Sequence, residues 1–281
     1  MSNTLDFLVD ILYTKCEVIE MLDEKIKIRI SGFLRETLEL DAQAFNFVKN
    51  NNEANLNSFL NKLIPNLLIL KKDRREKIFE YAKDSLNIPE TDLYKAEELI
   101  NNLNAIFDEI YFSDVELNEL TETIWIRPVK ENISVFDEII DSETEITGMD
   151  KSSYIRTLLN EFSRFPRYKK QQIVFAEECD ISLVARDSHR LLKFRFDGDI
   201  HKVFVFSCVY NYLQEQGNYI LCYDIGRNII CRYEISEVSA LHLLREKFEP
   251  NEKIETAIEK YCSEDLWLND IVVELGEEDN V

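Results

Sequence analysis

The residues of this sequence best suited to binding a ligand are the positively charged side chains of a short run, KIKIRIS, at positions 25–31. Lys25, Lys27 and Arg29 alternate with isoleucines. Because successive side chains of a strand point to opposite faces, this pattern predicts a strand that buries its isoleucines and displays its cations. Lysine and arginine on such a face can bind phosphates and the O6 and N7 atoms of guanine. An exposed edge strand protected against aggregation has the same pattern, so the run alone leaves both interpretations open.

A second alternating run, TETIWIRPV, lies at 121–129, and the helical patterns that follow the two runs also match. The motif SFL-x-x-LI at 58–64 recurs as SYI-x-x-LL at 153–159. A strand with two helices cannot bury its apolar faces alone, so we expect half-units at 25–70 and 123–165 to pair their strands antiparallel around one core. The outward side chains, which we expect to bind DNA or RNA, would be Lys25, Lys27, Arg29, Thr123, Trp125 and Arg127.

Trp125 has two interpretations within this set. Displayed on the ribbon, its ring would contact a thymine methyl group or stack on an unpaired base. A lone tryptophan is also commonly packed beneath a neighbouring helix, where it would bind nothing.

The remaining patterns predict an α+β protein with a mainly helical region over 1–165. Helical spacing occurs at 4–24, 33–47 and 56–68, the last beginning near Asn55 or Asn57 as a cap and kinked or shortened by Pro65. Charged helical patterns over 73–120 predict spacer helices. We expect a linker helix over 166–180, whose basic start (Arg164, Arg167, Lys169 and Lys170) is a solvated face or, less favoured, a second phosphate contact.

Short alternating runs over 181–248, separated by DGD, EQG and DIGR turns, predict a small β-sandwich or barrel. Residues 249–281 form an acidic extension suited to a protein partner or to self-shielding. The formal charge of −21 argues against non-specific coating of DNA, although it does not exclude a local basic face.

The sequence contains no residue pattern typical of an enzyme active site. The six cysteines have no metal-site spacing, and the three histidines are accompanied by no hydrolase, zinc or phosphate-loop motif. Glu234 and Glu237, three apart on an expected strand, would face opposite sides of the sheet and form no acid/base pair. We therefore expect no catalytic activity, no metal and no cofactor. The sequence lacks a signal-peptide pattern and an apolar run of about 20 residues, so we expect a cytoplasmic protein without a membrane partner.

The order of strand and two helices, with IWIRPV and SSYIRTLLNEF, resembles the ribbon-helix-helix fold. Residues 123–248, through SSYIRTLLNEFSRFPRYKKQQIVF, NYILCYD and ICRYEISEV, resemble bacterial WYL-domain proteins, with Asn218-Tyr219-Ile220 at the eponymous Trp-Tyr-Leu. These resemblances imply a DNA-reading ribbon whose second helices aim their N-termini at phosphates, followed by a five-stranded Sm-like barrel that senses a ligand. The layout also resembles accessory proteins of type VI CRISPR systems, which bind RNA and stimulate the effector nuclease.

The barrel resemblance implies an anionic-ligand site, which this sequence alters. Glu234 and Glu237 stand where the family has arginines, and two carboxylates would repel a phosphate. Tyr219 could stack on a ligand or belong to the core. Positive charge for the site would come from Lys193, Arg195, Arg227 and Arg232.

Two functions follow. The first is a DNA-binding transcriptional regulator whose barrel senses a ligand or nucleic acid. The alternative is a CRISPR-associated or other accessory protein that binds RNA or a protein partner. Fusion of both ribbon halves in one chain removes the need for a homodimer without forbidding one.

Overall fold

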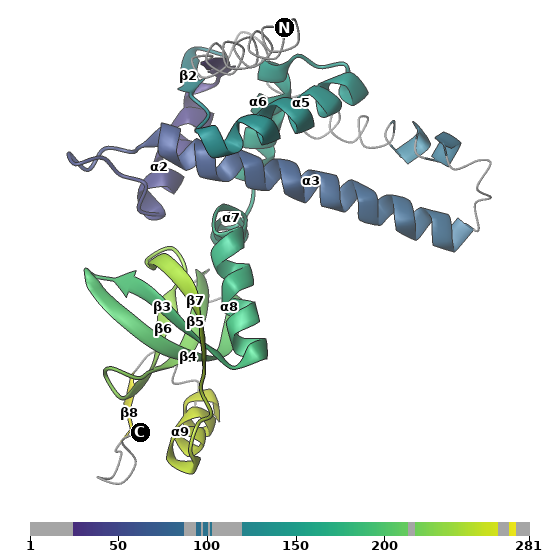
Figure 1. Cartoon of the computed structure of the whole chain (residues 1–281). Coiled ribbons are helices and arrows are strands. Elements are labelled where there is room, and N and C mark those ends of the chain that lie inside the picture. The colour runs from purple at the N-terminus through teal and green to yellow at the C-terminus, as the bar shows by residue number, and fades with distance from the viewer. Residues whose placement is uncertain are drawn as a thin grey trace, which may run out of the picture. The chain divides into compact units, whose positions relative to one another are not determined.

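The computed structural model describes residues 25–86, 94–96, 98–100, 102, 120–212, 217–263 and 270–273. The chain divides into two compact units, Met1–Arg164 and Phe165–Val281. The first unit is mainly helical, and the second holds a six-stranded antiparallel sheet (Figure 1). The expected α+β class is therefore confirmed. The helix expected at 4–24 and most of the spacer expected at 73–120 lie outside the described residues.

The first unit is built on a two-stranded antiparallel ribbon of β1 (Ile26–Ile30) and β2 (Glu122–Ile126). Ile28 lies opposite Ile124, and Ile26 opposite Ile126. The isoleucines at 28, 30, 124 and 126 are buried, which explains why the alternating runs pair with this face inward. The predicted pairing of two segments far apart in the chain is confirmed.

Helices from both half-units cover the buried face of the ribbon. α2 (Gly32–Ala44), α3 (Leu56–Leu86) and α6 (Lys151–Ser163) contact the strands. α5 (Ile133–Thr147), which follows a short 3-10 turn at Lys130–Asn132, packs against α3 and α6. Phe59 of α3 and Phe162 of α6 are fully buried, with ring centroids 6.1 Å apart. The helices that match in the repeat therefore share one core.

Helix α3 differs from the expectation, because it continues through Pro65 to Leu86 without a break (Figure 1). A proline inside a helix leaves the carbonyl four residues earlier without its N–H donor. Here that carbonyl belongs to Asn61, and the side chain of Asn132 donates to it at 2.6 Å. The expectation that Pro65 would shorten the helix was wrong, and the side chain of Asn132 replaces the hydrogen bond that the proline removes.

The second unit begins with two helices, α7 (Arg167–Val174) and α8 (Ala176–Ser188), that meet at Phe175. The helical segment extends past the expected end of the linker helix at 180. The strands are β3 (Arg190–Phe196), β4 (Asp199–Tyr212), β5 (Gly217–Asp224), β6 (Ile229–Glu234), β7 (Ser239–Lys247) and β8 (Ile271–Val272), with α9 (Glu252–Ser263) before β8.

The strand order of this sheet is β7-β3-β4-β5-β6-β8. β7 and β8 form opposite edges, and no pairing within the described part of the chain joins them into a closed barrel. An apolar cluster including Phe204, Tyr219 and Tyr223 of the sheet packs with Ile254 and Tyr261 of α9. No helix in the described ranges is long and apolar enough to cross a membrane.

Candidate nucleic-acid interface

The structure brings all six outward residues of the ribbon to one face. Lys27 lies opposite Trp125, and Arg29 lies opposite Thr123. Continuing this register by one residue places Lys25 beside Arg127. Thr123 is half-buried and the other members are exposed. The outer face thus presents four cations and one aromatic ring, and none of its six members is a carboxylate.

Trp125 is displayed on this face, and not packed beneath a helix. Its side chain is 52% exposed, and Lys27 Nζ lies 5.6 Å from the ring centroid. An ammonium group over an indole face is attracted by the ring quadrupole. Lys27 therefore helps to hold the ring in an outward position.

A pocket of about 460 Å³ opens beside Trp125 at the end of the ribbon, lined by Lys25, Asn57, Trp125 and Arg127. Asn57 comes from the first turn of α3 and accepts the Arg127 backbone N–H at 2.9 Å through its Oδ1 atom. The sequence pattern suggests Asn57 only as a helix cap. Asn55 performs that role, because its side chain accepts the Ser58 N–H at 3.2 Å.

Asn61 fixes the end of β2 to α3. Its amide nitrogen donates to the carbonyls of Asn57 at 2.8 Å and Arg127 at 2.9 Å, and its oxygen accepts the Val129 N–H at 2.8 Å. The residue is only 6% exposed. The alternating pattern gave no signal for this residue, because two of its partners, the Arg127 carbonyl and the Val129 N–H, are backbone groups from the other half-unit.

The opposite end of the ribbon has a different character. The Arg29 guanidinium donates to the Leu120 carbonyl at 2.8 Å, so part of its donor capacity is used within the protein. Arg156 of α6, which we did not include in the set, donates to the Arg29 carbonyl at 3.3 Å. Its guanidinium adds a further cation near this end.

The start of α6 does not have the anion-binding character that the ribbon-helix-helix resemblance implies. Asp150 caps the helix, accepting the Ser153 N–H at 2.9 Å and the Ser153 hydroxyl at 2.7 Å. The hydrogen bond from the Ser153 hydroxyl has the larger effect and the one from the Ser153 N–H the smaller, and both lower the pKa of Asp150. Its carboxyl group therefore stays charged. A carboxylate here repels phosphate, whereas the equivalent start of α3 carries the neutral Asn55.

Of the residues expected to form a ligand site in the second unit, Tyr219 and Arg232 lie against each other. Tyr219 is 7% exposed within the apolar cluster, and the Arg232 guanidinium carbon lies 4.8 Å from its ring centroid. Lys193 and Arg195 are exposed on β3. Arg227, in the turn after β5, donates to the Tyr233 hydroxyl at 3.2 Å. Tyr219 thus packs in the apolar core of this unit, with one face against Arg232.

The geometry of Glu234 and Glu237 also differs from the expectation. β6 ends at Glu234, and Glu237 lies in the following turn, where its N–H donates to the Glu234 carbonyl at 3.0 Å. Their placement on opposite faces of one strand was therefore wrong. Glu234 Oε1 accepts from Arg167 at 2.7 Å and from Gln171 at 2.7 Å, so this carboxylate fastens α7 to the sheet.

Glu237 supplies a pH-dependent prediction. Although the Glu237 residue is exposed overall, partial burial of its carboxyl group and then the charge of Glu234 raise its pKa, against the opposing charge of Arg167. Because the pKa of Glu237 is higher in the folded state, its contribution to the free energy of unfolding is most favourable below the ordinary glutamate pKa, where the carboxyl is protonated in both states. That contribution is lost as the pH rises through the folded-state pKa. We expect Glu237→Gln to raise the urea midpoint at about pH 7 and to leave it unchanged at about pH 4. Glu259→Gln, an exposed change on α9, controls for loss of one charge; equal shifts at both pH values would contradict the prediction.

A buried polar cluster lies between β4, β5 and β6. Asp224 Oδ2 contacts His201 Nδ1 at 2.7 Å and accepts the Tyr233 hydroxyl at 2.8 Å. Asp224 Oδ1 accepts the backbone N–H groups of Gly226 at 3.0 Å and Arg227 at 3.2 Å. Burial is the main cause that raises the pKa of Tyr233. The described residues contain no group of histidine, cysteine and acidic side chains that could hold a metal.

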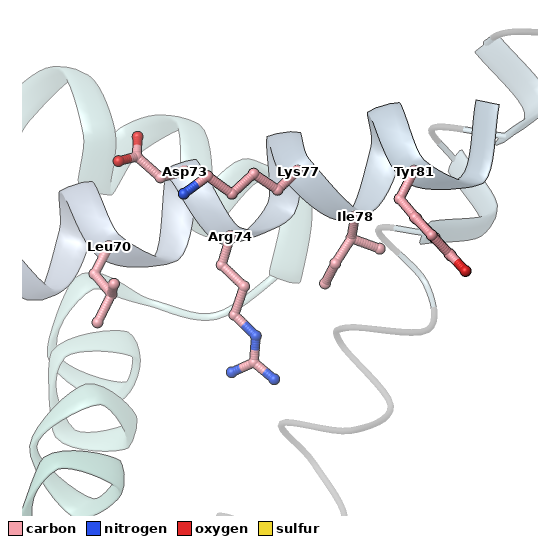
Figure 2. Close-up of a pocket in the computed structure, with 6 residues that line it drawn as sticks. All are labelled: Leu70, Asp73, Arg74, Lys77, Ile78 and Tyr81. Carbon is pink, nitrogen blue, oxygen red and sulfur yellow. The ribbon is translucent and has the colours of Figure 1, made fainter. Parts of the chain in front are cut away.

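A second hollow, of about 410 Å³, lies along the exposed side of α3 and is lined by Leu70, Asp73, Arg74, Lys77, Ile78 and Tyr81 (Figure 2). Figure 2 shows Leu70, Arg74 and Ile78 projecting from one side of the helix. Tyr81 is 75% exposed. This surface combines an aromatic ring with cations, as the ribbon does, but all its lining residues come from one helix.

Comparison with known proteins gives a likeness of fold. No family model matches the chain, and no curated protein matches it. A solved structure described as "Crystal structure of a CRISPR Cas-related protein" superposes with a TM-score of 0.58 at 13% identity, over 80% of this chain. The matched region is 64% of that protein, so this chain spans less than two thirds of its length.

Proposed function

We propose that this chain is a nucleic-acid-binding accessory protein of a CRISPR system, and that it binds through the outer face of the β1–β2 ribbon. The observation that carries the proposal is the gathering of Lys25, Lys27, Arg29, Trp125 and Arg127 on one exposed face. The CRISPR setting is supported by the fold likeness to a CRISPR Cas-related protein. The proposed role contains no catalytic step.

Electrostatics favours a local contact over coating of a long polymer. A chain of charge −21 repels a polyanion at long range, so binding requires a place where cations outnumber carboxylates. The ribbon is such a place. Each phosphate neutralised there releases counterions and makes the affinity depend on salt.

The finer architecture belongs to the same proposal. Paired strands, with the helices of both halves around one core, agree with a ribbon-helix-helix arrangement in which one chain supplies both halves. We assign the second unit a WYL-like origin without an anionic ligand at positions 234 and 237. Glu234 is held there by Arg167 and Gln171, and Glu237 adds a second carboxylate.

A DNA-binding transcriptional regulator is the second candidate. Lysine and arginine on a ribbon face can reach guanine in the major groove of a duplex. This function predicts a preferred duplex sequence, whereas the accessory role predicts binding to RNA or to a protein partner.

A binding titration tests the proposal. The full chain and its Lys27→Ala/Arg29→Ala/Arg127→Ala variant are titrated with duplex DNA, single-stranded DNA and RNA at several salt concentrations. Loss of three cations should weaken binding by about 10- to 100-fold and reduce the salt slope by about 0.7 per lost contact on a single strand, or about 0.9 on a duplex.

The matched control removes three cations from the exposed side of α3, as Lys72→Ala/Arg74→Ala/Lys77→Ala. Its affinity should stay near that of the unmodified chain. Absence of binding to every nucleic acid, or equal losses in the two triple variants, would overturn the proposal. Tightest binding to one duplex sequence would favour the regulator.

A further inference from the structure

We infer that the pocket at the end of the ribbon binds one unpaired nucleotide, with its base stacked on the ring of Trp125. The inference rests on the proposed nucleic-acid function and names the form of nucleic acid that this site takes. It starts from the pocket of about 460 Å³, which adjoins Trp125, the single aromatic residue of β1 and β2.

Trp125 offers a surface for stacking. Half of the side chain is exposed, and the ammonium group of Lys27 over the ring helps to keep it in place. Every nucleobase has a flat face that can stack on an aromatic ring, and each such contact raises affinity on the order of tenfold or more. An ordered, exposed indole beside a hollow therefore suits a flat heterocycle.

The other lining groups match the remainder of a nucleotide. Lys25 and Arg127 flank the ring and provide charge for the phosphates on either side of the base. The Asn57 oxygen is engaged by the Arg127 N–H, and its NH₂ group has no partner among the residues described. This amide can donate to a carbonyl or ring nitrogen on the base edge.

The same geometry disfavours a paired base. In a duplex, both faces of a base are covered by its neighbours and only the edges are open in the grooves. The ring of Trp125 would then find no face on which to stack. An unpaired base, which can turn out of its strand, meets this requirement.

The asymmetry of the ribbon supports the same conclusion. One end has Lys25, Trp125 and Arg127, and the other pairs Arg29 with Thr123, an aliphatic alcohol. Arg29 is partly engaged by Leu120, and the nearby helix α6 begins with the charged Asp150. A two-fold duplex site would call for similar groups at both ends, whereas a single nucleotide needs only one.

The experiment separates base stacking from phosphate binding. It uses the full chain with Trp267→Phe, so that Trp125 is the remaining tryptophan and reports by fluorescence. The probes are single-stranded DNA and RNA of equal length, a DNA strand of that length with every base removed, and a duplex. Intact strands should quench Trp125 and bind about 10- to 100-fold more tightly than the abasic strand.

Trp125→Ala should abolish this difference while changing the affinity for the abasic strand less than about twofold, and Trp125→Phe should restore part of it. Tyr81→Ala, which removes an exposed aromatic beside cations on α3, should leave the difference intact. Equal affinity for DNA and RNA strands would assign recognition to base and phosphate. Tighter RNA binding would add a contact to the 2′-hydroxyl group.

The possible failures are distinguishable. Equal binding of intact and abasic strands, or Trp125 fluorescence unchanged by intact strands, would overturn the inference and leave the phosphate-binding ribbon standing. Preference for a duplex that survives Trp125→Ala would also overturn it. Loss of binding to all probes, abasic strand included, would remove the proposed function itself.

Discussion

Replacing Asn61 with alanine is expected to lower the free energy of unfolding of the first unit by about 2–3 kcal/mol and to weaken nucleic-acid binding. The side chain does not lie on the outer face of the ribbon. It holds the Arg127 carbonyl and the Val129 N–H, and it is 6% exposed. Loss of the amide leaves these backbone groups unpaired and frees the end of β2, where two lining residues of the pocket reside.

Chemical denaturation gives the stability change, and titration with a single-stranded oligonucleotide gives the change in binding. Asn132→Ala is the graded control, because it removes one hydrogen bond to the Asn61 carbonyl and leaves the contacts to β2 in place. We expect it to cost about 1 kcal/mol. Unchanged stability and affinity in Asn61→Ala would show that the end of β2 does not depend on α3.

Replacing Asp224 with alanine is expected to destabilise the second unit by about 3–5 kcal/mol. This carboxylate is 1% exposed, and it is the shared partner of His201, Tyr233 and the turn that follows β5. Alanine leaves buried donors without an acceptor and removes the side chain that closes the turn. No packing gain offsets that loss, because alanine is smaller.

Hydrogen exchange measures this effect in place, since amides of β4, β5 and β6 should lose protection while amides of the first unit serve as the internal reference. Asp224→Asn keeps an oxygen for the turn and is expected to lose about half as much. Protection that stays the same in Asp224→Ala would mean that the cluster is not a stabilising centre of the sheet.

The ribbon was predictable from sequence because its signal is local. Alternation with a period of two residues fixes which side chains are buried, and a matching second run supplies the partner strand. The register itself, with Lys27 opposite Trp125 and Arg29 opposite Thr123, comes from the structure, because a slip of two residues would keep the same faces. The succession of short strands after 189 likewise indicated a small sheet.

What escaped prediction depends on contacts between distant segments. Asn57 and Asn61 look like ordinary polar helix residues until the backbone at 127–129 is placed against them. Glu237 was assigned to a strand because its segment was aligned with a strand of another family, whereas a turn begins after Glu234. Strand order and closure of the sheet are set by edge pairings, which the pattern of single strands does not encode.

Continuity of α3 through Pro65 has a consequence for the equivalence of the two halves. Pro65 leaves the Asn61 carbonyl without a backbone donor, and Asn132, supplied by the second half, donates to it instead. A molecule assembled from two copies of residues 25–70 would have no such donor, and its long helix would falter at that proline. The two halves are therefore not interchangeable, because the second supplies a hydrogen-bond donor to the long helix of the first.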